Sequence, residues 1–467
     1  MFIQPLPEVT QFIDRLNDGI HAHDPKQNLT RTQRLWLSCV LMGIIVTGQL
    51  CWASFARRDC FALYSEAAFR WIFRYAKLPW DILLRSSLQC IFKRYGITEG
   101  VLVLDDTDKS RSKKTTRIFG THKVRDKKTM GYFIGQELIF MVLVTPIATI
   151  PIDFCFYEPD PKRAAWRQAY QQAKRQGIAK KVRPLAPVQD PNYPTKVALA
   201  LTMIARFTAT FPQIRVKSVL ADALYGCAAF MNKVTAIPGI SQVISQLRST
   251  QLVISKGRPV ALKTYFQRQA GVKTEIKIRG GALKKVTLLS ARLKVKAQGQ
   301  RRFVVALKYE GETEYRFLVA SNLSWRHTDI VRTYTLRWLI EVFIEDWKQH
   351  GGWNQLTKHQ GEDGSRRGVI LSLLCDHCLL VHPDQAVRLE NKKPGLPVGC
   401  LIERLKVQST IHTITTVVED VNPQEKLKKL SEILLSQLPD RDSSKHMAGL
   451  DLGRQDASES LKYRAAA

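Results

Sequence analysis

The sequence predicts an α/β protein in which a helical N-terminal region precedes a mixed core of strands and helices, and a β-rich insertion interrupts that core. Three observations favour this class. Apolar residues recur at helical spacing through residues 61–88. From residue 101 onwards, short β-branched and leucine-rich runs alternate with helical segments. Residues 272–278 alternate apolar and polar side chains, which is typical of a strand.

The order of these segments divides the chain into five regions. At 467 residues the chain is too long for one compact core, so several regions are expected. After about Leu438 the sequence is polar and rich in small residues, which predicts a disordered tail. The regions are helical N-terminal (1–95), first part of the core (96–249), β-rich insertion (250–325), core-closing helices (326–385) and C-terminal with the tail (386–467).

The core region has a definite succession of elements. Three strands come first, then helix, strand, helix and strand, and long helices follow the insertion. This succession predicts a ribonuclease H-like (retroviral integrase-like) core. The strands are expected at Val101–Leu104, Tyr132–Val144, Ile150–Tyr157, Val216–Leu220 and Gln242–Leu247, and the helices at 160–183 (with a loop), 194–210, Thr328 to about His350, and Val369–Val381.

The charge of the chain indicates a polyanionic partner. Lys and Arg number 71 against 41 Asp and Glu, a formal net charge of +30. Nucleic acid is the commonest partner of such a charge; a generic solubilising charge is the alternative. With 45% hydrophobic residues the chain can bury a core, which excludes a wholly disordered protein.

The nine cysteines are scattered and odd in number, which favours reduced thiols in a cytosol over a disulfide framework. Cys375 and Cys378 form a single CxxC with apolar flanks, so we expect a buried helix and no zinc site. No signal peptide is expected at the start of the chain. The apolar stretch Leu35–Ala56 contains polar residues and is interpreted as a buried helix of a protein without membrane partners.

Carboxylates follow two of the expected strands. Asp105 and Asp106 come directly after Val101–Leu104, and Asp222 comes shortly after Val216–Leu220. Ligand crevices of α/β sheets lie at the carboxyl ends of strands. Taken singly, each aspartate is also an ordinary turn residue.

The expected helix from Thr328 adds a polar stripe to these carboxylates. At 100° per residue, its polar residues fall on one stripe about 80° wide, and the apolar residues cluster on the opposite side, facing the core. A solvated face with ion pairs one turn apart is the alternative interpretation. The polar stripe comprises Tyr334, Arg337, Glu341, Glu345 and Lys348, and the apolar side comprises Leu336, Leu339, Ile340, Phe343 and Trp347.

Two aspartates and one glutamate converging from two strands and a helix suit hard divalent cations. We predict that Asp106, Asp222 and Glu341 hold two Mg²⁺ ions, with Mn²⁺ as an expected substitute. Two such ions activate the nucleophile and stabilise the leaving oxygen of an in-line displacement at a phosphodiester. Cationic and phenolic side chains beside them, from Tyr334, Arg337 and Lys348, suit the DNA phosphates.

The spacing of Tyr334, Arg337, Glu341 and Lys348 matches the signature of insertion-sequence DDE transposases that have a β-rich insertion in the catalytic core. The run Leu104-Asp105-Asp106-Thr107 resembles their first-aspartate block. The run from Leu220 to Gly226, which contains Asp222, resembles their second. The resemblance covers about residues 28–385.

This resemblance implies cut-and-paste transposition in the bacterial cytoplasm, on the nucleoid. The enzyme would require Mg²⁺ and act as a homodimer in a synaptic complex with double-stranded DNA, both transposon ends and target. Some relatives form a DNA hairpin and stack a flipped base on a tryptophan of the insertion. No tryptophan lies between Trp166 and Trp325, so this insertion offers Tyr265, Tyr309 and Tyr315 instead.

Basic segments support DNA binding. The run from residue 109 to 128 holds nine Lys or Arg, among them Lys113, Lys114, Lys127 and Lys128. Because the run directly follows the first carboxylates, we expect it to contact the DNA backbone; a solvated loop is the alternative. Recognition of the transposon ends is assigned to the helical region 1–95.

Two choices of acid stay open to test. Glu345 lies one helical turn beyond Glu341, and we choose Glu341 from its spacing to Arg337 and Lys348. Adjacent strand residues point to opposite faces, so we expect only one of Asp105 and Asp106 to face the metals and choose Asp106, which precedes Thr107. The function is therefore predicted as DNA transposition. The alternatives are a ribonuclease H-fold nuclease without strand transfer and an inactive, transposase-derived DNA-binding protein.

Overall fold

The protein is described from a computed structural model that covers residues 4–58, 63–111, 117–126, 129–278, 281–352 and 359–437. Its N-terminal region is helical, as the sequence predicted. Thr30 begins the second helix with a capping box to Gln33, and Gly48 ends it with a φ of 64°. The helices are α1 (Pro7–His23), α2 (Arg31–Thr47), α3 (Trp52–Arg58), α4 (Glu66–Tyr75) and α5 (Trp80–Tyr95).

Helix α2 buries most of the apolar stretch that resembled a membrane span. The described residues 36–45 are all buried against the neighbouring helices. Helix α2 ends at Thr47, and the last residues of the stretch belong to α3. The interpretation as buried helical sequence is therefore confirmed, but two helices form where one was expected. Within the part of the chain that the structure describes, no helix combines the length and the apolar character that crossing a membrane requires.

The core sheet has the strand order β4-β3-β1-β5-β6. Strand β3 runs antiparallel to both of its neighbours, β1 and β4, whereas β1, β5 and β6 run parallel. The short β2 pairs with the first residues of β3, beyond the stretch that β4 covers. The bounds are β1 (Glu99–Ser110), β2 (His122–Arg125), β3 (Tyr132–Val144), β4 (Thr149–Tyr157), β5 (Arg215–Leu220) and β6 (Val243–Leu247).

The predicted β-rich insertion extends this same sheet. Strand β12 pairs antiparallel with β6 on one side and with β11 on the other, so one twelve-stranded sheet crosses the molecule. The insertion comprises β7 (Leu252–Ser255), β8 (Arg258–Ala261), α9 (Leu262–Gln267), β9 (Val272–Lys277), β10 (Leu283–Val295), the 3₁₀ turn η3 (Lys296–Gln298), β11 (Gln300–Tyr309) and β12 (Arg316–Ala320).

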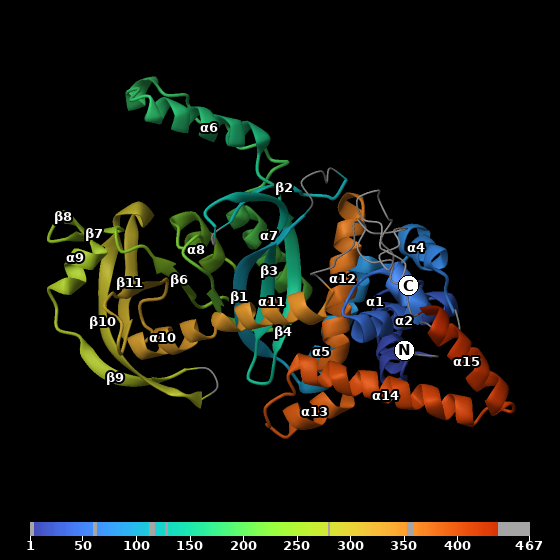
Figure 1. Cartoon of the computed structure of the whole chain (residues 1–467). Helices are drawn as coiled ribbons and strands as arrows, with labels where there is room; N and C mark the ends of the chain where they lie inside the picture. Colours follow the sequence, from blue (N-terminus) through green and yellow to red (C-terminus); the bar gives the residue numbers. More distant parts are fainter. Residues whose placement is uncertain are drawn as a thin grey trace, which may run out of the picture.

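Helices cover both faces of the core sheet. Helix α11 crosses one face of β1, β3 and β4, and α7 packs on β3 and β4 from behind in the view of Figure 1. Helix α6 and the 3₁₀ turn η1 form an arm that stands off the body of the molecule (Figure 1). The bounds are α6 (Pro161–Arg175), η1 (Lys180–Val182), α7 (Lys196–Thr210), α8 (Ala228–Thr235), α10 (His327–Thr335) and α11 (Trp338–His350).

The prediction of a single helix from Thr328 to about His350 is wrong, since α10 and α11 are separate helices. At the break, the amide N–H groups of Leu336 and Arg337 donate to carbonyls three residues back, at 3.0 Å each. The chain keeps turning in this tightened 3₁₀ step, so the apolar spacing continues across it. Ile340, Phe343 and Trp347 of α11 are buried, as the helical pattern predicted.

The C-terminal helices pack on the N-terminal ones. Helix α12 contacts α5 and α2, and most of the buried apolar residues that the structure describes form one continuous core. The bounds are α12 (Gly361–Leu380), α13 (Pro383–Glu390), α14 (Val398–Val418) and α15 (Pro423–Gln437). The predicted tail after Leu438 lies outside the described residues.

The CxxC of α12 belongs to the core, as expected. Cys375 and Cys378 are buried. Between them, the imidazole of His377 lies 2.7 Å from the carbonyl oxygen of Pro151 and 2.8 Å from the hydroxyl of Ser87. His377 therefore joins α12 to β4 and α5.

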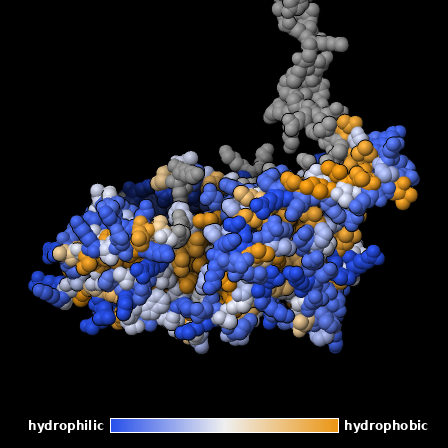
Figure 2. Space-filling model, turned by 90° about the horizontal axis from the view of Figure 1, so that it is seen from below, coloured by the Kyte–Doolittle hydropathy of each residue, from blue (hydrophilic) through white to orange (hydrophobic). Residues whose placement is uncertain are grey.

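Hydrophobic side chains gather on the surface at the end of the molecule formed by α14 and α15 (Figure 2). On α14, Val407, Ile411, Ile414 and Val418 are more than half exposed, and Val421 follows at 94%. Their spacing alternates between four and three residues, which is the spacing of a coiled-coil seam.

Candidate metal centre

Strand β1 has a notch on its β5 side. Its pairing with β5 ends at Val103 and Leu220, whereas its pairing with β3 continues to Ser110. The sequence predicted that this strand ends at Leu104. Strand β3 supplies backbone partners that extend it, so Asp105 and Asp106 lie inside the strand. Beside them, the loop after β5 takes the place of a neighbouring strand and brings in Asp222.

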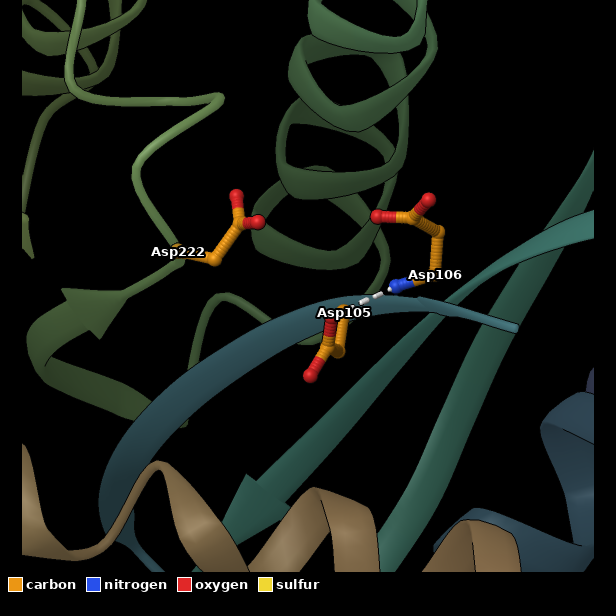
Figure 3. Close-up of side chains that lie close together, drawn as sticks. All are labelled: Asp105, Asp106 and Asp222. Carbon is orange, nitrogen blue, oxygen red and sulfur yellow. Dashed lines mark hydrogen bonds between the residues drawn. The ribbon is translucent and has the colours of Figure 1, made fainter. Parts of the chain in front are cut away.

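Three carboxylates meet at this notch. Asp105, Asp106 and Asp222 each offer an oxygen, and these three atoms lie within 4.8 Å of one another. Asp106 and Asp222 face each other above the strand, and Asp105 lies below it (Figure 3). The alternation of Asp105 and Asp106 is as predicted. One carboxylate oxygen of Asp105 nevertheless lies within 4.8 Å of oxygens of Asp106 and Asp222, so the expectation that only one of the two aspartates faces a metal stays a prediction.

The electrostatics of the notch favour a bound cation. Burial raises the pKa of Asp105 to about 6, and the charges of Asp106 and Asp222 act in the same direction, against Arg337. Crowded carboxylates repel one another, and a divalent cation with oxygen ligands relieves that repulsion. Among the described residues, this is the group of acidic, His or Cys side chains that fits a metal ion.

On the lower face of the strand, Arg337 connects the notch to α11. Its guanidinium donates to Asp105 at 2.7 Å and also forms an ion pair with Glu341. Burial by itself lowers the pKa of Arg337, but Tyr334, Asp105 and Glu341 outweigh burial and raise it. Two members of the predicted triad, Asp106 and Asp222, therefore come together directly, and Glu341 reaches the cluster through Arg337.

On the upper face, a network that the sequence analysis did not assign surrounds Asp106. The ammonium group of Lys196 donates to Asp106 at 2.5 Å and to Glu137 at 2.9 Å, and His122 lies 2.9 Å from the other oxygen of Glu137. Burial by itself raises the pKa of Glu137, but His122 and Lys196 outweigh burial and lower it. In the sequence, Glu137 is a single charged residue within the largely apolar run of β3. That feature could have marked it as a candidate site residue.

Three side-chain hydrogen bonds from other elements help to hold the loop that carries Asp222. The hydroxyl of Tyr334 donates to the carbonyl of Ala221 at 3.3 Å, and Ser245 donates to the carbonyl of Asp222 at 2.5 Å. From the insertion, Gln298 donates to the carbonyl of Gly226 at 2.9 Å. A side chain at Gly226 would place its Cβ 2.4 Å from the carbonyl oxygen of Gln246, so only glycine fits.

Tyr225 has a buried hydroxyl on which the charges of the carboxylates act. The residue is 0% exposed, and its hydroxyl finds no hydrogen-bond partner within the described structure. Burial raises its pKa, and the charges of Asp106 and Asp222 add to that effect. An unpartnered buried hydroxyl costs free energy, so Tyr225 is a candidate donor to a ligand bound near these carboxylates.

The predicted phosphate-binding residues lie in different surroundings. Tyr334 is buried and supports the Asp222 loop in this structure, so a phosphate contact by its hydroxyl stays a prediction. Lys348 is half-buried; burial lowers its pKa and the charge of Asp108, on β1, partly offsets that. No ion pair joins Lys348 to Glu345 in the part of the chain described. Lys113, Lys114, Lys127 and Lys128 lie outside the described residues.

Comparisons with known proteins add little to this geometry. No protein-family model matches the chain, and no curated protein matches it. Among solved structures, the NurA nuclease from Sulfolobus solfataricus is similar over 51% of this chain and 72% of that chain, at 8% sequence identity and a TM-score of 0.20. So weak a likeness carries no argument, and the function has to be inferred from the side chains themselves.

Proposed function

We propose that this chain is a metal-dependent DNA transposase of the insertion-sequence DDE type, which cuts and rejoins DNA at terminal inverted repeats. The observation that carries the proposal is the notch, where Asp105, Asp106 and Asp222 place three oxygens within 4.8 Å of one another. Glu341 is linked to Asp105 by two ion pairs that share Arg337. These are the residues at which the sequence resembles the DDE family.

The arrangement of the core sheet supports a ribonuclease H-like fold for this enzyme. Three antiparallel strands come first, and the two later strands β5 and β6 add to the edge of β1 in parallel. Helices α7 and α8 follow β4 and β5 in the chain. This is the succession that the sequence predicted for such a core.

The residues at the notch fit hard divalent cations. All candidate ligands are carboxylate oxygens, which Mg²⁺ prefers. Asp106, Asp222 and Glu341 would hold two Mg²⁺ ions, and Asp105 is a further candidate. Bound there, the metal would activate a hydroxyl nucleophile and stabilise the leaving oxygen.

The protein's own groups prepare this chemistry. Arg337 fixes Asp105 and Glu341 relative to each other, and Lys196 holds Asp106 and Glu137. The bonds from Tyr334, Ser245 and Gln298 keep the Asp222 loop in place. Such preorganised support keeps the ligands in position when the metal and the phosphodiester arrive.

The same geometry would serve a nuclease that hydrolyses DNA without joining it, so the products must decide. A plasmid carrying the gene with its flanking DNA is incubated with the protein in Mg²⁺. The proposal predicts excised ends that become joined to target DNA, and loss of both products with Asp106→Asn. Asp105→Asn is the matched neighbour and should retain more cleavage. Cut but unjoined DNA would favour the nuclease, and intact DNA would contradict both functions.

The apolar stripe of α14 supports a homodimer. The exposed residues Val407, Ile411, Ile414 and Val418 form a seam that fits a second copy of the same helix. The positions beside the seam, Gln408, Thr410 and Thr415, are uncharged, so two strongly basic copies can meet there without charge repulsion. Sedimentation should show a dimer that Ile411→Glu with Ile414→Glu converts to a monomer; a monomeric wild type, alone and with DNA, would contradict this.

A further inference from the structure

A cavity of about 600 Å³ opens on the upper face of the sheet beside Asp106. Its size lies within the range of about 300–1,000 Å³ that ligand sites occupy. Asp106, Asp108 and Glu137 form an acidic part of the wall next to the notch. The opposite part comes from β2 and from the base of the α6 arm, and the basic residues of the wall are His122, Lys123, Arg125, Arg167 and Lys196.

The basic residues of this cavity fall into two groups. Lys196 and His122 are engaged with the carboxylates of Asp106 and Glu137. Lys123, Arg125 and Arg167 are exposed, and none of them forms an ion pair with a described carboxylate. Lys123 lies 4.7 Å above the ring of Tyr132, and Arg125 contacts the sulfur of Met130 at 3.9 Å. These three cations are therefore available to an anionic ligand.

The arm above the cavity continues this basic surface. Helix α6 stands away from the body (Figure 1) and buries only Ala173 of its own residues. Its shape is held internally, because Trp166 donates to the carbonyl of Pro184 at 2.7 Å and Asp160 caps its first turn. Residues 161–195 include Asp190 as their acidic residue, against the basic residues Lys162, Arg163, Arg167, Lys174, Arg175, Lys180, Lys181 and Arg183.

We propose that β2 and the α6 arm form a clamp on the DNA backbone, which holds the strand that the carboxylates cut. The inference rests on the proposed function and extends it to this surface. The scissile phosphate would lie at Asp106. Lys123, Arg125 and Arg167 bind the phosphates next to it, since all four residues line one cavity. The basic residues of the arm lie along the duplex beyond them.

Charge decides in favour of DNA over a second copy of the chain. A partner copy would bring its own net charge of +30 to the basic arm, and like charges oppose that association. DNA supplies closely spaced phosphates along its axis and gains free energy as counterions leave. The exposed Val182, Leu185 and Val188 of the arm are the feature that a protein partner would use instead, and the test below includes that outcome.

The test measures binding of the full-length protein to a short fluorescent duplex by anisotropy in EDTA, over a range of salt. Arg125→Gln with Arg167→Gln should lower affinity about tenfold or more and reduce the salt slope by about 1.8, because each phosphate contact contributes about 0.9. Replacing the same residues by Lys should restore most of the affinity. The control, Lys393→Gln with Lys428→Gln, removes two exposed charges from α13–α15, far from the arm, and should change affinity less than about twofold.

Equal effects of the clamp and control pairs would overturn the proposal. So would a change of sedimentation, with unchanged DNA binding, in a Val182→Ser, Leu185→Ser variant, because that result assigns the arm to a protein partner. Binding in EDTA does not depend on cleavage. The two proposals fail in different ways. If Asp222→Asn abolishes cleavage but the clamp variants bind DNA normally, the clamp is refuted and the proposed function stands. If the clamp variants bind DNA weakly but the wild type does not cleave it, the proposed function is refuted and the clamp stands.

Discussion

The ammonium group of Lys196 lies 2.5 Å from a carboxylate oxygen of Asp106, although the two residues are 90 positions apart. Burial by itself lowers the pKa of Lys196, but Asp106 and Glu137 outweigh burial and raise it, so the side chain is a fixed cation at the edge of the notch. A divalent ion that binds Asp106 comes close to this charge, and the two cations compete for the same carboxylate.

Replacing Lys196 should therefore strengthen metal binding. Lys196→Gln removes the competing charge and leaves a side chain that can still donate to Glu137. At this separation the repulsion between the two cations exceeds about 1.4 kcal/mol, so the affinity for Mn²⁺ should rise about tenfold or more. Calorimetric titration with Mn²⁺ measures it. Affinity equal to that of the wild type would mean that the metal does not bind Asp106.

Tyr225→Phe separates a role in the site from a role in folding. The substitution removes a buried hydroxyl that has no partner among the described residues, so stability should stay within about 1 kcal/mol or rise. If the hydroxyl donates to a ligand in the notch, DNA cleavage should fall about tenfold or more at the same time. Thermal unfolding and a cleavage assay give the two numbers. Cleavage at the wild-type rate would remove Tyr225 from the site.

The sequence predicted the strands that bury apolar runs with accuracy. Strand β3 has the predicted bounds of Tyr132–Val144, because its side chains are apolar along most of its length. The end of β1 was missed, since Asp105 to Ser110 are polar and become a strand only through pairing with β3. The break at Leu336 was missed because a 3₁₀ step preserves the helical spacing of apolar residues.

The site residues that could be predicted are those that follow the expected strands or match the spacing of the family signature. Asp106 and Asp222 were assigned from the sequence and meet in the structure. The roles of Lys196 and Glu137, and the contact between Arg337 and Asp105, could not be assigned, because each contact joins segments far apart in the chain. Such convergence depends on the tertiary fold and leaves no local pattern.

Glu341 and Glu345 distinguish two registers of α11. Glu341 is half-buried and paired with Arg337, whereas Glu345 is exposed. Glu341→Gln should lower cleavage by about 100-fold or more, because a charge at a metal site contributes several kcal/mol. Glu345→Gln keeps the same chemistry one turn away and should cost far less. Rates in the reverse order would show that Glu345 is the ligand.

The partly buried carboxyl of Asp376, on α12, should make stability depend on pH. Burial, and then the neighbouring Asp346, raise its pKa from 3.8 to about 7. In the unfolded chain this carboxyl ionises at its usual pKa, so the folded protein loses stability as pH rises from about 4 to about 7. The loss is on the order of a few kcal/mol.

Asp376→Asn removes that dependence and should stabilise the protein at pH about 8 but not at pH about 4. Thermal unfolding at the two pH values measures the difference. The exposed Asp18 is the control, and Asp18→Asn should change the melting temperature little at either pH. An equal shift for Asp376→Asn at both values would show that the carboxyl ionises alike in the folded and unfolded chains.

The central claim is that the carboxylates of the notch hold the metal that cuts DNA, and Asp222→Cys tests it most directly. A thiolate is a poor ligand for Mg²⁺, which prefers oxygen, and a better one for softer ions. Cleavage by this variant in Mg²⁺ should fall by about 1,000-fold, and Mn²⁺ should restore part of it, whereas the wild type should cut in either metal. Cleavage by Asp222→Cys in Mg²⁺ at the wild-type rate would contradict the claim.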